Sequence, residues 1–115
     1  MRDLEELRRR VREFVAERDW ERFHSPKNLA MALSVEAAEL VELFQWLTEE
    51  ESAAPDAERR RRVGEEMADV LWFLVRIADR LDIDLLAAAE AKLAANAAKY
   101  PAERVRGQSK KYDEY

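Results

Sequence analysis

Two predicted helical segments each carry an acidic pair on a side that is otherwise apolar, and this pattern restricts how the chain can fold. Glu36 pairs with Glu39, and Glu66 pairs with Asp69; residues three apart lie on one side of a helix. At about 100° per residue, Glu36 falls in the middle of a leucine stripe, and Glu66 falls among valine, leucine, isoleucine and phenylalanine. A carboxylate facing a core is costly unless it is paired or binds a cation. The pattern therefore favours two helices that face each other with a shared positive charge between the pairs.

A hard divalent cation with oxygen ligands is the simplest source of that charge. Glu36, Glu39, Glu66 and Asp69 are candidate ligands for Mg²⁺, with Mn²⁺ as an alternative. Magnesium keeps part of its water shell and often shares its coordination sphere with substrate phosphates. Such a site suits metal-assisted displacement at phosphorus, and a carboxylate that is not fully used as a ligand can act as a general base. The four acids are therefore also the candidate catalytic residues.

Two other interpretations of the acids remain open. The first is that they form salt bridges with nearby arginines and lysines, as acids on helices ordinarily do. The second is a di-iron carboxylate bundle, which requires a Glu-x-x-His motif on two helices. The only histidine of the chain, His24, lies in a predicted loop, and neither acidic pair ends in histidine. The pattern therefore disfavours the di-iron interpretation.

The composition predicts an all-α fold. The 115 residues include only 2 glycines and 3 prolines, and alanine, leucine, glutamate and arginine dominate. Helical spacing of the apolar residues predicts four helices, over 3–18, 27–49, 57–81 and 85–99, with a polar loop between the second and third. We expect one domain over residues 1–100 and a polar C-terminal tail over 101–115. The third helix has a second apolar face, which predicts a four-helix bundle completed by oligomerisation.

Several classes of protein are disfavoured by composition and charge. The absence of cysteine excludes a disulfide framework and a thiolate metal site. A net charge of −5 argues against binding to polymeric nucleic acid, although it leaves a nucleotide possible as a ligand. The chain shows neither a signal peptide nor an apolar run long enough to span a membrane. We therefore expect a cytoplasmic protein without a membrane partner.

Aromatic and cationic side chains suggest how a nucleotide could be held. Trp20 and Trp46 could stack against a base, although a tryptophan is more commonly a packing residue. Lys92, Asn96 and Lys99 follow one side of the alanine-rich fourth helix and could contact phosphates or a base, unless this side is simply solvated.

Three segments together resemble the MazG-like all-α nucleoside triphosphate pyrophosphohydrolases, in particular the branch of small single-domain dCTP pyrophosphatases. The segments are RDWERFHSPKNLAMALSVEAAELVELFQW, GEEMADVLWFLV and KLAANAAKYP, in this order. The E-x-x-E and E-x-x-D motifs are short, but together with D-W-x-x-F-H-x-P-x-N-L and K-x-x-x-N-x-x-K-Y-P they form a specific pattern. The resemblance extends from about Glu17 to the end of the chain.

This resemblance implies a four-helix MazG-like bundle that hydrolyses an NTP to NMP and pyrophosphate with Mg²⁺. It implies dCTP or modified pyrimidine dNTPs as substrates, a role in nucleotide-pool sanitation, and dimers or tetramers whose active sites combine residues of more than one copy. The metal ligands would be Glu36, Glu39, Glu66 and Asp69. The implied substrate-binding residues are Trp20, His24 and Trp46 around the base, with Lys92, Asn96, Lys99 and Tyr100 reaching the rest of the substrate.

Two alternatives to an enzyme remain at this point. One is a non-catalytic helical dimerisation or nucleotide-sensing module that has the same fold. The other is a structural four-helix protein in which the acids form salt bridges. The structural four-helix protein can be distinguished by its melting temperature. Added Mg²⁺ should leave that temperature unchanged, whereas a metal that binds only the native state raises it.

Overall fold

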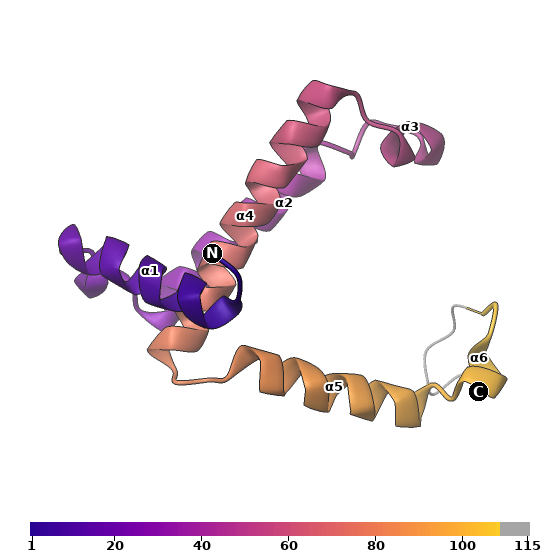
Figure 1. Cartoon of the computed structure of the whole chain (residues 1–115). Coiled ribbons are helices and arrows are strands. Elements are labelled where there is room, and N and C mark those ends of the chain that lie inside the picture. The colour runs from indigo at the N-terminus through magenta and orange to yellow at the C-terminus, as the bar shows by residue number, and fades with distance from the viewer. Residues whose placement is uncertain (109–115) are drawn as a thin grey trace. The chain divides into compact units, whose positions relative to one another are not determined.

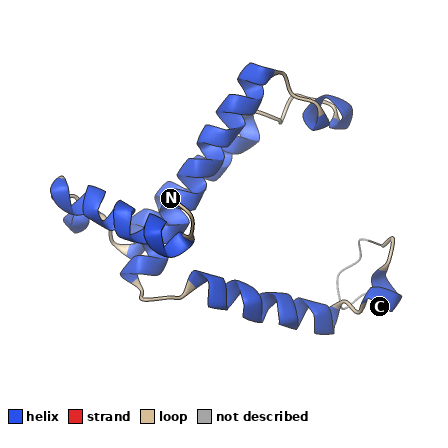
Figure 2. Ribbon diagram, viewed as in Figure 1, coloured by secondary structure: helices blue, strands red, loops and turns tan. Residues whose placement is uncertain are grey.

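The computed structural model describes residues 1–108, and its regular structure in this range is entirely helical (Figures 1 and 2). The predicted all-α class is therefore confirmed. The elements are α1 (Leu4–Glu17), the 3-10 turn η1 (Glu21–Phe23), α2 (Pro26–Glu42), α3 (Glu49–Ala53), α4 (Ala57–Arg80), α5 (Leu85–Lys99) and α6 (Ala102–Val105).

Side-chain caps explain where the long helices begin. The Asp3, Asp56 and Asp84 carboxylates accept from backbone N–H groups at the starts of α1, α4 and α5. The Ser25 hydroxyl accepts from the N–H of Asn28 at 3.1 Å, and Pro26 occupies the first turn of α2. These caps satisfy N–H groups that have no partner within the helix. The starts predicted from the sequence therefore lie within one residue of those observed.

Two predicted segments differ from the structure. The second helix was expected over 27–49 but ends at Glu42, and a series of turns follows it. The predicted polar loop contains the short helix α3, because Thr48 and Glu51 form a reciprocal capping box. Within the expected tail lies the short helix α6, and residues 109–115 are outside the described range, so the expectation of a tail stays a prediction. Apolar periodicity alone did not reveal these local caps.

The chain divides into two compact units, Met1–Asp82 and Ile83–Tyr115. The first contains α1 to α4, and the second contains α5 and α6. The expected single domain over 1–100, with a tail after it, stays a prediction.

The first unit is built around α4. Helices α2 and α4 run side by side in opposite directions, and α1 also packs against α4 (Figure 1). Its fully buried apolar side chains are few: Val11, Val15, Leu29, Leu43, Val75 and Ala78. This core is small, so charged interactions at its edge have a large share in holding α1 in place.

Asp79 of α4 forms such an interaction with α1. Its side chain is 3% exposed, and it accepts hydrogen bonds from Arg8 at 2.6 Å and from Arg12. Arg76, one turn earlier on α4, donates to the same carboxylate at 3.0 Å. Burial by itself would raise the pKa of Asp79, but the bonds from Arg12 and Arg8 outweigh it and lower the pKa. Asp79 thus fastens α1 to α4 as an ionised carboxylate.

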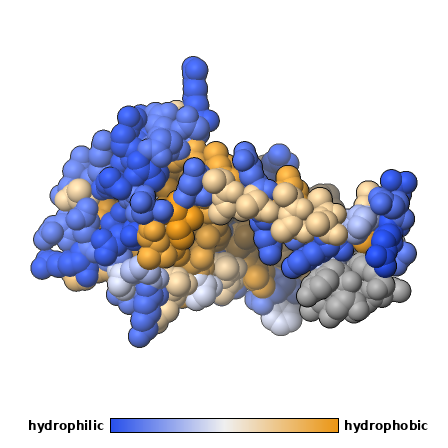
Figure 3. All heavy atoms as spheres, turned by 90° about the horizontal axis from the view of Figure 1, so that it is seen from below, coloured by the Kyte–Doolittle hydropathy of each residue, from blue (hydrophilic) through white to orange (hydrophobic). Residues whose placement is uncertain are grey.

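Apolar side chains also remain at the surface of α2 and α4. Met31 and Val35 of α2 and Met67 of α4 are more than half exposed, and Leu71 and Leu74 of α4 are 38% exposed. Hydrophobic side chains also show at the surface on the face drawn in Figure 3. Exposed apolar residues that gather on neighbouring helices are typical of interaction surfaces. No helix within residues 1–108 is both long and apolar enough to cross a membrane.

Candidate functional site

The antiparallel pair α2–α4 brings three of the four predicted acids together. Glu36 and Glu39 come from α2, and Glu66 comes from α4. One carboxylate oxygen of each residue lies within 4.8 Å of the others, and all three side chains are half-buried. We call these three residues the acidic cluster. Asp69 is exposed and is not part of it, although its charge raises the pKa of both Glu36 and Glu66.

The acidic cluster lacks the partners that would explain it as a salt-bridge network. The Oε2 atoms of Glu36 and Glu66 are buried and have no hydrogen-bond partner. No lysine or arginine among residues 1–108 forms a salt bridge with any of the three carboxylates. Buried polar atoms normally have a partner, and buried charges are normally neutralised. The geometry therefore disfavours the salt-bridge interpretation.

The crowding of negative charge changes the protonation of the cluster. Burial, followed by the neighbouring Glu39 carboxylate, raises the pKa of Glu36 to about 7. Burial and Glu39 also raise the pKa of Glu66. Two carboxylates in contact can form a hydrogen bond only if one of them holds a proton, which favours the neutral form. A bound cation would replace that proton.

The raised pKa of Glu36 predicts an unusual pH dependence of the metal-free protein. A raised folded-state pKa gives stability that is fully present below the unfolded pKa and is lost as pH rises through the folded pKa. This stability is therefore lost between about pH 4.5, the ordinary pKa of the group, and about pH 7, the pKa of Glu36 in the folded protein. We expect the free energy of unfolding of the wild type, relative to Glu36→Gln, to fall by roughly 2 kcal/mol across this pH range, allowing for partial exposure.

Urea titrations with EDTA at intervals from pH 4.5 to 8 would measure this difference. Using Glu36→Gln as the reference cancels the titration of all other groups that the substitution does not perturb. Parallel curves for the two proteins would contradict the raised pKa.

The oxygen donor set and its unpartnered buried atoms fit a hard divalent cation. Carboxylates from two facing helices supply only oxygen ligands, which Mg²⁺ and Mn²⁺ prefer. Glu36, Glu39 and Glu66 are positioned to hold the ion, and Asp69 stays a predicted fourth ligand. The nature of the ion stays a prediction as well.

The predicted aromatic residues lie at both ends of α2. After α1, Asp19 adopts a left-handed conformation with φ 53°, and the N–H of Trp20 donates to the carbonyl of Val15 at 3.1 Å. This turn places Trp20 near His24, with 6.5 Å between the ring centroids. Trp46 instead lies in the turns after α2 and is 87% exposed. Trp20 and His24 thus form one group, and Trp46 is separate from it within this unit.

His24 has close neighbours on α4 that the sequence did not single out. Its ring meets the Trp72 ring edge-to-face, with 5.8 Å between centroids, and its Nδ1 accepts from Arg76 Nε at 3.3 Å. Burial lowers the pKa of His24, and the positive charges of Arg76 and Arg80 lower it further. Arg76 lies between the apolar residues Val75 and Ile77. A charged residue among apolar ones is the signal that identified Glu36, and the same signal could have identified Arg76.

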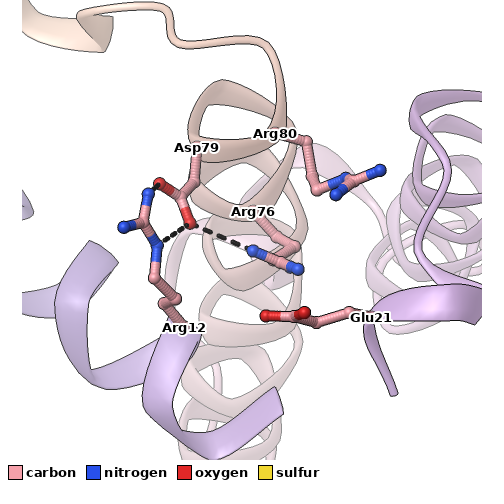
Figure 4. A pocket seen from close by; sticks show the side chains of 5 residues that line it. All are labelled: Arg12, Glu21, Arg76, Asp79 and Arg80. Atoms are coloured by element: carbon pink, nitrogen blue, oxygen red, sulfur yellow. Dashed lines mark hydrogen bonds and ion pairs between the residues drawn. The ribbon is translucent and has the colours of Figure 1, made fainter. Parts of the chain in front are cut away.

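A surface pocket of about 270 Å³ lies beside this group (Figure 4). Arg12, Glu21, Arg76, Asp79 and Arg80 line it. None of the acidic-cluster residues is among them, so this pocket is distinct from the candidate metal site.

The remaining predicted substrate residues lie in the second unit. Lys92, Asn96 and Lys99 are on α5, and Tyr100 caps its C-terminal end. Both lysines and Asn96 are exposed. Their contribution to the site stays a prediction.

Comparison with known proteins supports these observations. The model of the MazG-like family matches residues 31–115, which include the acidic cluster. Among curated proteins, dCTP pyrophosphatase 1 of Homo sapiens is 47% identical over 113 residues, or 96% of this chain and 66% of the relative. The Mus musculus dCTP pyrophosphatase 1 is 46% identical over 95% of this chain and 65% of the relative. The chain thus spans slightly less than two thirds of these relatives.

A solved structure has a similar fold. A pyrophosphatase from Archaeoglobus fulgidus superposes with a TM-score of 0.80 and is 42% identical in sequence. The match covers 84% of this chain and 91% of the archaeal chain.

Proposed function

Because this chain belongs to the MazG-like family, we propose that it is a nucleoside triphosphate pyrophosphohydrolase that converts an NTP and water into NMP and pyrophosphate. The observation that carries the proposal is the acidic cluster, with its two buried and unpartnered carboxylate oxygens. A purely structural domain has no use for three facing carboxylates without a counter-charge, since each raises the cost of ionising the others.

Glu36, Glu39 and Glu66 would hold the metal ion, with Asp69 as a further candidate ligand. When bound, Mg²⁺ supplies positive charge for the phosphates and favours ionisation of a water molecule. In the reaction, a water oxygen attacks phosphorus, the bridging bond of the α–β anhydride breaks, and pyrophosphate leaves. A carboxylate of the cluster accepts the proton of the water, and we assign this role to Glu39.

The substrate is proposed to be dCTP or a modified pyrimidine dNTP, which makes the protein an enzyme of nucleotide-pool sanitation. The relatives named dCTP pyrophosphatase 1 support this choice. Trp20, a residue that is 42% exposed, is available to stack on the base. His24 lies beside it, two residues before α2 begins, and α2 rises by about 15 Å from Pro26 to Glu36, at 1.5 Å per residue. An extended nucleoside triphosphate could span this separation with its phosphates at the acidic cluster.

We also propose that the active site combines residues of two copies of the chain. Trp20 precedes α2 and Trp46 follows it, and a helix of 17 residues is about 25 Å long. One base therefore cannot stack on both tryptophans of the same α2. The exposed apolar residues of α2 and α4 offer a surface on which a second copy could supply the other ring.

This shared site predicts complementation between two variants that each bind the nucleotide weakly. Trp20→Ala and Trp46→Ala should each raise KM by roughly ten-fold or more, because a stacked base contributes about 1–3 kcal/mol. When the two variants are unfolded together and refolded in equal amounts, mixed dimers should contain one intact site. Random mixing then restores wild-type KM at about a quarter of the sites.

Initial rates at low nucleotide concentration would measure this recovery, with each variant refolded alone as the control. A mixture no more active than the mean of the separate variants would place both tryptophans, if they act at all, in sites formed by single chains.

The function itself is tested by identifying the products from a panel of nucleotides. The purified protein is incubated with Mg²⁺ and each canonical or 5-modified dNTP, and the products are separated by ion exchange. Monophosphate and pyrophosphate, lost on adding EDTA, are the expected result. Diphosphate and orthophosphate would indicate a different phosphohydrolase. Binding without turnover by any nucleotide would instead support the non-catalytic sensing module.

A further inference from the structure

Arg76 is a charged residue in a buried position, with 3% of its surface exposed, and the side chain of its partner Asp79 is also 3% exposed. A buried arginine is costly unless its charge and its N–H groups have partners. Its Nη1 donates to Asp79 Oδ2 at 3.0 Å, and its Nε donates to His24 Nδ1 at 3.3 Å. Figure 4 shows the guanidinium of Arg76 beside Asp79, between α1 and η1. Arg76 thus connects the ion cluster at α1 with the histidine that precedes α2.

The contact with Arg76 determines which nitrogen of His24 carries the proton. A guanidinium keeps its protons throughout the accessible pH range, so its Nε–H can only donate. His24 Nδ1 must therefore accept, which requires an unprotonated Nδ1 and leaves the proton of the neutral ring on Nε2. The lowered pKa of His24 agrees with a neutral ring in this position.

The Nε2 side of His24 is available for a ligand. Within residues 1–108 no hydrogen bond involves Nε2, and this atom is not among the buried atoms that lack a partner. It is therefore not fully buried. The neighbouring Trp20 ring is tilted by 57° relative to the His24 ring. The Nε2–H donor thus belongs to a ring that lies beside the partly exposed residue Trp20.

We propose that Arg76, held by Asp79, is a positioning residue that keeps His24 as an Nε2–H donor for a hydrogen-bond acceptor on the nucleobase edge of the substrate. This inference rests on the proposed function, because it assumes that a base stacks near Trp20. It explains why a charged residue occupies a buried position of α4. Arg76 itself does not contact the substrate.

A double-mutant cycle tests whether Arg76 acts through His24. Arg76→Met keeps an unbranched apolar stem that reaches about as far as the arginine Nε, and it leaves Asp79 paired with Arg8 and Arg12, so we expect this variant to fold. His24→Ala removes the donor, and each single change should raise KM for the preferred dNTP by about 3- to 10-fold, the worth of one hydrogen bond. In the His24→Ala background, adding Arg76→Met should cause no further increase, and kcat should change little throughout.

Arg62→Lys is the matched control, because it alters an exposed arginine of the same helix. It should leave KM unchanged. Effects of Arg76→Met and His24→Ala that multiply in the double variant would overturn the proposal, since Arg76 would then act independently of His24.

A second measurement needs no variant and no activity. Because His24 is the only histidine, its two ring nitrogens can be observed by ¹⁵N NMR without assignment among several residues. Above the pKa of the ring, the proton should reside on Nε2 with Nδ1 unprotonated, and a proton on Nδ1 would overturn the proposal even if Arg76→Met fails to fold. If the wild type hydrolyses no nucleotide, the proposed function fails. If it hydrolyses nucleotides normally but His24 has its proton on Nδ1, or the effects of the two substitutions multiply in the double variant, only the proposed role of Arg76 is refuted.

Discussion

Replacing Glu36 with glutamine is expected to lower turnover by about three orders of magnitude or more, equivalent to ~4 kcal/mol of transition-state stabilisation. Glu36 is one of the three residues of the acidic cluster, and its buried Oε2 has no hydrogen-bond partner among residues 1–108. Glutamine keeps the size of the side chain but replaces one ligand oxygen with an NH₂ group, which cannot bind a cation. The same change should stabilise the metal-free protein at neutral pH, because it removes one of the clustered negative charges.

Two measurements separate this expectation from simple damage to the fold. Thermal unfolding with and without Mg²⁺ should show a metal-dependent rise in Tm for the wild type that Glu36→Gln largely loses, because a ligand of the native state stabilises it by mass action. The control is Glu13→Gln, a change of the same kind at an exposed position of α1, which should leave both turnover and the metal effect intact. Near-wild-type turnover of Glu36→Gln at saturating Mg²⁺ would show that the cluster is not the catalytic centre.

Replacing Asp79 with alanine is expected to destabilise the protein by about 3–5 kcal/mol, the usual cost of removing one partner from a buried ion pair. Asp79 neutralises the buried Arg76 and binds Arg8 and Arg12 of α1. Without it, Arg76 keeps a buried charge with no counter-ion, and α1 loses its ionic attachment to α4. A loss of this size is a large part of the stability of a small domain.

Urea unfolding at pH 7 would measure this loss. Glu58→Ala provides the matched control, because it removes an exposed carboxylate that pairs with Arg61 on the surface of α4, and exposed pairs contribute little. Similar urea midpoints for Asp79→Ala and Glu58→Ala would show that the ion pairs of Asp79 do not hold α1 against α4. The pH dependence should agree: the pKa of Asp79 is lowered, so its contribution is present at neutral pH and is lost as pH falls through the folded-state pKa.

The candidate metal site could be predicted largely from the sequence. Glu36 and Glu66 were identified because a carboxylate on an apolar stripe has a cost that demands an explanation, and the structure places both beside Glu39. The helices were predictable for a similar reason: periodic apolar residues, N-terminal caps and the scarcity of glycine and proline all act locally along the chain.

Periodicity was less informative where local hydrogen bonds decide the structure. The leucine stripe in the sequence continues to Leu47, but α2 ends at Glu42. Turns follow it, and the capping box of Thr48 and Glu51 then starts the separate helix α3. The expected helix over 27–49 includes Trp46, but α2 ends at Glu42 and leaves this residue in a turn, at the opposite end of α2 from Trp20.

The sequence by itself determined the all-helical class, the caps that start the long helices and the two acidic pairs, because propensity, capping and apolar spacing depend on residues within a few positions of one another. Only the tertiary structure decided that Glu66 meets Glu36 and Glu39 while Asp69 remains outside their cluster. It alone also joined Arg76 to His24 across 52 positions of the chain. Such contacts depend on how α4 packs and rotates against its neighbours, and this is set by the combined fit of many side chains in the core.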